Sequence, residues 1–140
     1  MAWPTEEELR EIYAETQTIA VVGASGDENK PGHRIPRYLK SQGFKIIPVN
    51  PTADEVLGER AYPSLSDVDM PIDTVEVFRP AEEAPDIARQ AVAMGAKHLW
   101  LQEGIVSEEA REVAEEGGVK VVMDMCMGAT HGWLGLGPGP

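Results

Sequence analysis

The sequence predicts a three-layer α/β fold built on a five-stranded parallel sheet, and three observations lead to this prediction. Short apolar runs alternate along the chain with longer segments of helical periodicity, which is the pattern of β-α-β units. The first run, residues 19–22, is apolar at successive positions, as expected of a strand buried on both faces. It ends at a glycine-containing loop, residues 23–32, where Gly23 and Gly26 would allow positive φ and a close approach of the backbone to a ligand.

The two helices around this first strand have recognisable start and stop signals. A helix is predicted over residues 5–15, because Thr5 and Glu8 form a capping box ahead of an apolar stripe at helical spacing. A second helix is predicted around residues 35–39, after the loop, and Gly43 ends it. The loop and the N-terminus of this second helix together predict a site for an anion.

The rest of the chain repeats the alternation. Four further apolar runs predict strands two to five, at 44–49, 72–78, 97–101 and 119–123. Helices are predicted between the later strands, at 81–94 and 107–116. Two segments predict no regular element: 52–65, apart from a helical turn near 64–68, and the Gly- and Pro-rich stretch 127–140.

Right-handed crossovers leave few topologies for five parallel strands. We therefore expect a Rossmann-like, doubly wound sheet with the strand order 3-2-1-4-5, whose ligand lies at the carboxyl ends of the strands where the order reverses. We divide the chain into an N-terminal helical segment (1–17), the sheet domain (18–127) and a Gly/Pro-rich tail (128–140).

The charge of the chain limits the classes of ligand. The 140 residues carry a net charge of −12, which disfavours nucleic acid and anionic membranes as partners. Five of the twelve basic residues nevertheless lie within a short stretch beside the glycine loop: Lys30, Arg34, Arg37, Lys40 and Lys45. This position favours a small anionic ligand over the alternative of a solvated basic helix face.

The chain has no apolar run long enough to span a bilayer, and its acidic N-terminus is unlike a signal peptide. The single cysteine, Cys126, cannot form an internal disulfide, which is typical of a reducing compartment. We therefore expect the protein to be cytoplasmic, in the cytosol. One cysteine and three scattered histidines give no metal-ligand spacing, so no metal site is predicted.

Familiar nucleotide motifs do not fit the loop. In a dinucleotide fingerprint that starts at Gly23, Ser25 and Glu28 stand where glycines are needed, and Asn50 stands near the position of the ribose-binding acid. No G-K-[ST] sequence occurs, which excludes a Walker A loop. Ser25 also lacks the second glycine of a nucleophile elbow, and we interpret it as a small loop residue that contacts a phosphate.

Six short motifs occur in order at the strand ends: I-A-V-V-G-A-S, I-I-P-V-N-P, G-E-R-A-Y-P-S-L, V-F-R-P, W-L-Q-E-G-I and V-V-M-D-M-C. Together they resemble the small stand-alone CoA-binding proteins, whose fold is similar to the N-terminal CoA-binding domain of the succinyl-CoA synthetase α subunit. The resemblance covers about residues 18–127 and implies coenzyme A, or an acyl-CoA, as the ligand.

The resemblance also implies roles by position. The CoA phosphates would lie on the loop residues Gly23, Ala24, Ser25 and Gly26. Lys30 and Arg34 would supply positive charge, and Asn50 and Pro51 would border the adenosine. The segment Phe78, Arg79 and Pro80 would wall the site, and the segment Gln102, Glu103 and Gly104 would approach the pantetheine arm.

No catalytic residue is predicted. None of His33, His98 and His131 matches the phosphohistidine of the synthetases, which lies in a second domain. His33 could contact phosphate or face water, with about equal weight, and Cys126 is interpreted as a small buried apolar residue instead of a reactive thiol. We therefore expect a non-catalytic binding module. The alternatives are a subunit of an acyl-CoA ligase or transferase that needs a partner chain and, less favoured, an NAD(P)-binding protein.

Overall fold

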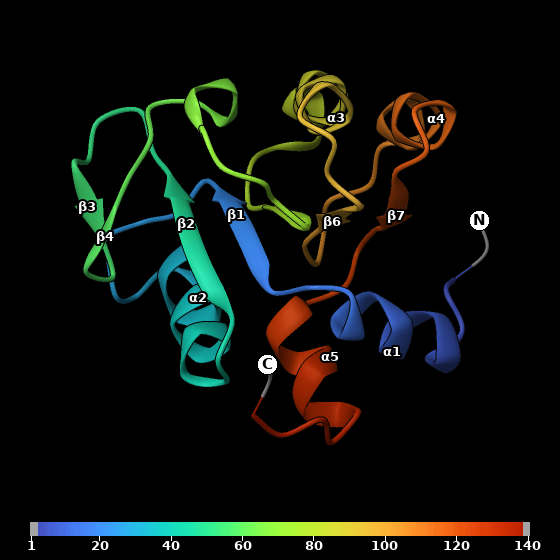
Figure 1. The fold of residues 1–140 in the computed structure, drawn as a ribbon, viewed down its shortest axis with the longest axis horizontal. Coiled ribbons are helices and arrows are strands. Elements are labelled where there is room, and N and C mark those ends of the chain that lie inside the picture. The colour runs from blue at the N-terminus through green and yellow to red at the C-terminus, as the bar shows by residue number, and fades with distance from the viewer. Residues whose placement is uncertain (1–2, 139–140) are drawn as a thin grey trace.

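Five parallel strands form the centre of the molecule in a computed structural model that describes residues 3–138 (Figure 1). The strands are β1 (Thr18–Val22), β2 (Lys45–Val49), β5 (Thr74–Val77), β6 (His98–Leu101) and β7 (Lys120–Val122). Helices α3 (Ala84–Ala93) and α4 (Glu108–Glu116) cover one face of the sheet, and α1 (Glu6–Ala14), α2 (Pro31–Ser41) and α5 (Met127–Trp133) cover the other. The predicted three-layer, doubly wound α/β fold is confirmed.

The predicted strand order needs a correction. The sheet runs β2-β1-β5-β6-β7, which is 2-1-3-4-5 when the sheet strands are numbered along the chain, and not 3-2-1-4-5. The second strand lies at the edge because it contains Pro48, which has no N–H to offer an outer neighbour. The carbonyl of Pro48 accepts from the Tyr62 N–H on the side away from β1, where the missing N–H would also point. The third strand, β5, is instead buried at every residue, as an internal strand requires.

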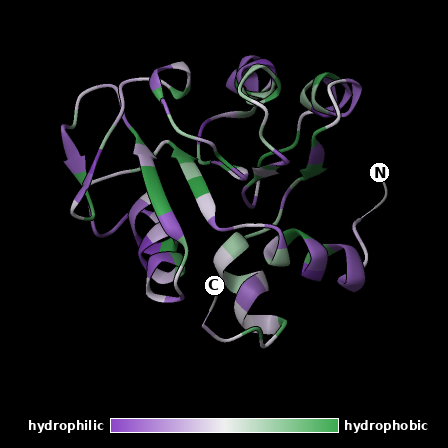
Figure 2. Ribbon diagram, viewed as in Figure 1, coloured by the Kyte–Doolittle hydropathy of each residue, from purple (hydrophilic) through white to green (hydrophobic). Residues whose placement is uncertain are grey.

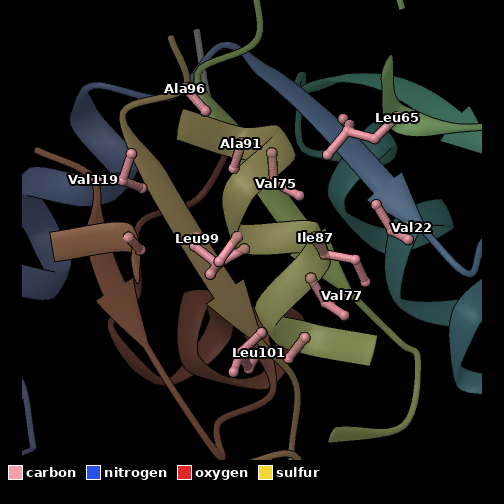
Figure 3. Close-up of a cluster of buried hydrophobic side chains, with 14 of the residues drawn as sticks. Val22, Leu65, Val75, Val77, Ile87, Ala91, Ala96, Leu99, Leu101 and Val119 are labelled. Atoms are coloured by element: carbon pink, nitrogen blue, oxygen red, sulfur yellow. The ribbon is translucent and has the colours of Figure 1, made fainter. Parts of the chain in front are cut away.

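Each face of the sheet has its own apolar core. Figure 3 shows the core under α3, where Val75, Val77 and Leu99 of the strands pack with Ile87 and Ala91 of the helix. A second core lies under α1, α2 and α5. The central strands carry long hydrophobic stretches, whereas α1 and much of α2 are hydrophilic (Figure 2). This pattern agrees with strands that are buried on both faces.

The local start signals act as predicted. Thr5 caps α1, and both hydrogen bonds of the capping box with Glu8 are formed. Ser107 caps α4 through the Ala110 N–H. Helix α2 begins earlier than predicted, because Pro31 occupies its first turn, where a missing N–H costs nothing.

The segment predicted as loop contains a short antiparallel ribbon, β3 (Glu55–Val56) and β4 (Glu59–Arg60). Its turn has positive φ at Leu57 and Gly58, the type I′ geometry that suits a two-residue hairpin. A short 3₁₀ helix, η1 (Leu65–Asp67), lies inside the predicted helical turn. A second one, η2 (Ala81–Glu83), precedes α3.

The prediction of no regular element after residue 126 is wrong, because the segment forms α5. Met127 and His131 of α5 are almost completely buried. The Tyr13 hydroxyl donates to the Met127 carbonyl at 2.6 Å, and the Tyr38 hydroxyl lies 2.8 Å from His131 Nδ1. These contacts with α1 and α2 hold the helix despite its glycines. Residues 1–2 and 139–140 of the predicted terminal segments lie outside the described residues, and the division at 17 and 127 stays a prediction.

Across the described chain, none of the helices is long and apolar enough to cross a membrane.

Candidate functional site

A cleft of about 1080 Å³ lies at the carboxyl ends of the strands. This is the edge at which doubly wound sheets bind their ligands. Most of the residues predicted to form a site line this cleft: Gly23, Ala24, Ser25, Lys30, Arg34, Asn50, Pro51, Phe78, Arg79, Gln102 and Glu103. The lining does not include the other three predicted residues, Gly26, Pro80 and Gly104.

The first turn of the cleft depends on Gly23, which follows β1 directly. Its φ is +93°, a left-handed conformation, and a Cβ there would lie 3.1 Å from the Phe78 Cβ. The prediction of positive φ is confirmed for Gly23. It is wrong for Gly26, which does not have positive φ and whose Cβ position is open, with no atom of residues 3–138 within 4 Å.

The close backbone approach instead involves Gly32, which the sequence interpretation did not single out. A Cβ at Gly32 would lie 2.5 Å from the carbonyl oxygen of Gly23. Gly32 therefore lets the first turn of α2 pack against the end of β1, the role of the third glycine in a dinucleotide fingerprint. The sequence did contain a signal for this role, a glycine directly after Pro31 at the start of a helix. Because the loop is longer than in a dinucleotide fingerprint, this glycine lies further along the chain than the third glycine of that motif.

Two carbonyl groups of the loop are hydrogen-bonded to side chains. Asn50 Nδ2 donates to the Ala24 carbonyl at 2.9 Å, and His33 Nδ1 lies 2.7 Å from the Ser25 carbonyl. The Asn50 Oδ1 accepts from the N–H groups of Thr52 and Ala53, which fixes its orientation. For His33, the sequence left contact with a phosphate and exposure to water as alternatives. The structure shows a third arrangement, in which His33 is only 8% exposed and its ring contacts the backbone of the loop.

Several backbone N–H groups of the loop remain available as donors. Among residues 3–138, the backbone N–H groups of Ala24, Gly26 and Gly32 donate to no other protein atom in the structure. Lys30 occupies the N-cap position of α2 without a capping side-chain bond, and no acidic residue lies in the first helical turn. The loop and the helix N-terminus thus present donors and partial positive charge.

Charged side chains divide the cleft into two walls. Lys30 and Arg34 lie on the α2 side, and the Arg34 guanidinium donates to the Asn29 carbonyl. Glu82 and Asp86 lie on the α3 side. A site of this kind attracts anions at its α2 end and disfavours them at its α3 end.

Arg79 also lines the cleft. It pairs with Glu83 through two contacts of 2.8 and 3.1 Å. The side-chain hydrogen bonds of this pair raise the pKa of Arg79 and lower the pKa of Glu83. Both side chains are about half exposed, so the pair can exchange partners with a ligand at little cost.

Gln102 and Cys126 lie at the β6–β7 end of the cleft. Gln102 is 5% exposed, and its Oε1 accepts from the Met127 N–H at 2.9 Å. Cys126 caps α5, with its Sγ 3.4 Å from the Ala129 N–H. The interpretation of Cys126 as a buried apolar residue is wrong, because the side chain is only partly buried and lines the cleft.

A carboxyl group lies buried in the sheet, on β5. Glu76 of β5 is 0% exposed, and within residues 3–138 neither of its carboxyl oxygens has a hydrogen-bond partner. Burial raises the pKa of Glu76 to about 8, because the ionised form would lose its hydration. The group is therefore mostly protonated at neutral pH.

The two remaining histidines are structural. His98 lies between Glu15 and Thr74, at 2.9 and 3.0 Å, and burial lowers its pKa. His131 packs edge-on against the rings of Tyr13, Tyr38 and Phe44. Neither lines the cleft. Within residues 3–138, no group of three His, Cys, Asp or Glu side chains is placed to hold a metal ion.

Comparison with known proteins identifies the family of the chain. The family model described as "CoA binding domain" matches residues 17–132. The chain is 41% identical to the uncharacterized protein YneT of Bacillus subtilis, over 91% of this chain and 95% of that protein. It is 38% identical to a solved structure from Thermus thermophilus, cell-free ID.343, with a TM-score of 0.88 over 94% of this chain and 99% of that one.

The chain is also similar to parts of larger enzymes. It is 36% identical to the ADP-forming acetate–CoA ligase II of Archaeoglobus fulgidus over 77% of this chain, which is only 16% of the length of the ligase. The resemblance to CoA-binding proteins and to the CoA-binding domains of succinyl-CoA synthetase-like enzymes is thereby confirmed.

Proposed function

The chain belongs to the CoA-binding domain family, and from this premise we propose that it is a binding protein for coenzyme A or an acyl-CoA. The observation that carries the proposal is the loop after β1. Its carbonyl groups are occupied by Asn50 and His33, whereas the N–H groups of Ala24, Gly26 and Gly32 donate to no protein atom within residues 3–138. Such a set of donors suits phosphate oxygens.

Positive charge beside the loop supports the same ligand. Lys30 and Arg34 line the cleft next to the free N–H groups, and a guanidinium can bind two phosphate oxygens at once. The adenosine and pantetheine groups would extend along the strand ends, past Asn50 and Pro51 on one side and past Phe78, Gln102 and Glu103 on the other. The cleft of about 1080 Å³ is large enough for an elongated ligand.

NAD(P) fits the same site less well. A dinucleotide site needs an acidic side chain near the end of the second strand for the ribose hydroxyl groups. The residue there is Asn50, and both ends of its amide are already engaged by the Ala24 carbonyl and the Thr52 and Ala53 N–H groups.

The ligase relatives favour a second candidate function. We propose as the alternative that the chain supplies the CoA-binding part of an ADP-forming acyl-CoA ligase and works with a partner chain. The purified chain alone is then expected to form no ATP from acetyl-CoA, ADP and phosphate. ATP formed by this chain alone would contradict both the binding-module proposal and the need for a partner. The single Cys126 favours a reducing, cytosolic setting for either function.

The direct test is calorimetric titration with CoA, with NAD and ATP as comparison ligands. We expect saturable binding of CoA and little response to the other two. Arg34→Ala should weaken CoA binding by about tenfold or more, since hydrogen bonds to charged groups contribute about 1.5–3 kcal/mol. Arg37→Ala is the matched control, because Arg37 is exposed on the same helix and does not line the cleft.

Added salt should weaken CoA binding further, because it screens exposed charges. Equal affinities of the Arg34→Ala and Arg37→Ala variants would place the phosphates elsewhere. Binding of NAD without binding of CoA would overturn the proposed ligand.

A further inference from the structure

The side-chain amide of Gln102 holds an unused donor in the cleft. The backbone N–H of Met127 can only donate, so the Gln102 atom 2.9 Å from it is the acceptor Oε1. The other end of the amide is therefore Nε2, which carries two N–H groups. Neither donates to any atom of residues 3–138, and Nε2 is not among the fully enclosed polar atoms that lack a partner. Because Gln102 is 95% buried and lines the cleft, Nε2 faces the cleft.

A donor held in this way calls for an acceptor on the ligand. Leaving a largely desolvated N–H group without a partner is unfavourable, whereas a carbonyl oxygen at that point would satisfy it. The orientation of the amide is fixed by the start of α5, so the donor is positioned before any ligand arrives.

The place of Gln102 along the cleft identifies the part of the ligand that it meets. The phosphates are assigned to the loop after β1, and Gln102 follows β6, two strands away in the order β1-β5-β6. With neighbouring strands about 4.8 Å apart, the donor lies about 10 Å across the sheet from the loop. The arm of a CoA molecule extends at least that far from its phosphates. It carries two amide carbonyl groups along its length and ends in the thiol or the acyl thioester.

The surroundings of Gln102 also limit the acyl group. Cys126 and Ile105 line the same end of the cleft, so small and apolar surface is available there. Glu103 is exposed beside Gln102, and Glu82 and Asp86 line the facing wall. These carboxylates would repel an acyl group that itself carries a carboxylate.

We propose that Gln102 is a specificity-determining residue whose Nε2 donates to the thioester carbonyl oxygen. The protein then binds CoA thioesters of short, uncharged acyl groups in preference to free CoA. This inference rests on the proposed function, since it requires that CoA binds in this cleft.

Titrations of the wild-type protein with CoA, acetyl-CoA and succinyl-CoA give the first test. One additional neutral hydrogen bond should make acetyl-CoA bind about two- to tenfold more tightly than CoA. Succinyl-CoA should bind more weakly than acetyl-CoA. Equal affinities for CoA and acetyl-CoA would overturn the inference and leave the proposed function standing, whereas failure of all three ligands would overturn both.

The Gln102→Glu variant isolates the donor. Glutamate keeps an oxygen for the Met127 N–H and replaces Nε2 by a second oxygen, so the preference for acetyl-CoA over CoA should disappear, and the added charge should weaken the binding of both ligands. Gln17→Glu, which adds the same charge at an exposed position away from the cleft, is the control. The Gln102→Met variant removes the donor without adding charge and should also lose the preference. An equal loss of affinity for CoA and acetyl-CoA in both Gln102 variants would show that the donor meets another part of the ligand, and would overturn the assignment.

Discussion

Replacement of Gly32 by alanine tests how the fold builds the loop. The added Cβ would lie 2.5 Å from the Gly23 carbonyl oxygen, a distance that real side chains do not adopt, and the atom it meets belongs to the backbone. Either the start of α2 or the end of β1 must move. Overpacking of this kind destabilises a protein by about 1–3 kcal/mol. Alanine has a better helix propensity than glycine, by up to about 1 kcal/mol, and this offsets part of the loss.

We therefore expect Gly32→Ala to lower the free energy of unfolding by about 1–2 kcal/mol, and the Tm by several degrees. The matched control is Gly26→Ala in the same loop, where nothing lies within 4 Å of the Cβ position and φ is not positive. That variant should change stability by less than about 0.5 kcal/mol. Thermal unfolding followed by circular dichroism measures both variants.

The same variant should impair the site. A displaced α2 would lengthen the hydrogen bond from the Ser25 N–H to the Gly32 carbonyl, which is now 3.1 Å. It would also turn the free N–H groups of the loop away from one another. CoA affinity should therefore fall in Gly32→Ala, beyond any change in Gly26→Ala. If Gly32→Ala is as stable as Gly26→Ala and binds CoA like the wild type, the account of the loop is wrong.

Two carboxyl groups, Glu76 fully buried and Asp73 partly buried, give opposite pH dependences. Burial raises the pKa of Glu76 to about 8 from an ordinary value of 4.5, so between these values the folded chain holds a proton that the unfolded chain has released. Stability should fall as the pH rises through this window, by up to about 1.4 kcal/mol per pH unit, and Glu76→Gln should remove this slope in urea unfolding at pH 5 to 9; an unchanged slope would contradict the assignment. Asp73 is partly desolvated, but the N–H groups of Gln17 and Thr18 and the Lys97 ammonium outweigh this and keep its pKa below the ordinary value. Asp73→Asn should therefore lose about 1–2 kcal/mol at pH 7, and the difference from wild type should shrink as the pH falls below 3.8; a difference that persists at pH 2 would refute the ionic origin.

The sequence predicted the elements best where the signals were local. The capping box at Thr5, the cap at Ser107 and the apolar strands act over a few residues, and all appear in the fold. The strand order was predicted wrongly, although one residue in the sequence indicated that the second strand lies at an edge. Pro48 lacks an N–H and belongs at an edge, whereas the predicted order places its strand inside the sheet.

Other features depend on tertiary contacts that no local pattern encodes. Helix α5 contains Gly128 and Gly132, and it forms because Met127 and His131 are buried against distant tyrosines. Most of the residues predicted for the site, through strand ends and motif resemblance, do line the cleft. The sequence did not predict that His33 contacts the Ser25 carbonyl or that Gln102 keeps a free donor. Both features depend on which backbone group lies next to each side chain in the folded structure.

The central claim is that the loop N–H groups after β1 receive the phosphates of CoA. The most direct measurement is the change in backbone amide NMR signals when CoA is added to ¹⁵N-labelled protein. The account predicts that the signals of Ala24, Gly26 and Gly32 shift most, in a saturable way, with smaller changes along the first turn of α2. Saturable changes confined to the α1 and α5 face, or no change at high CoA concentration, would contradict it.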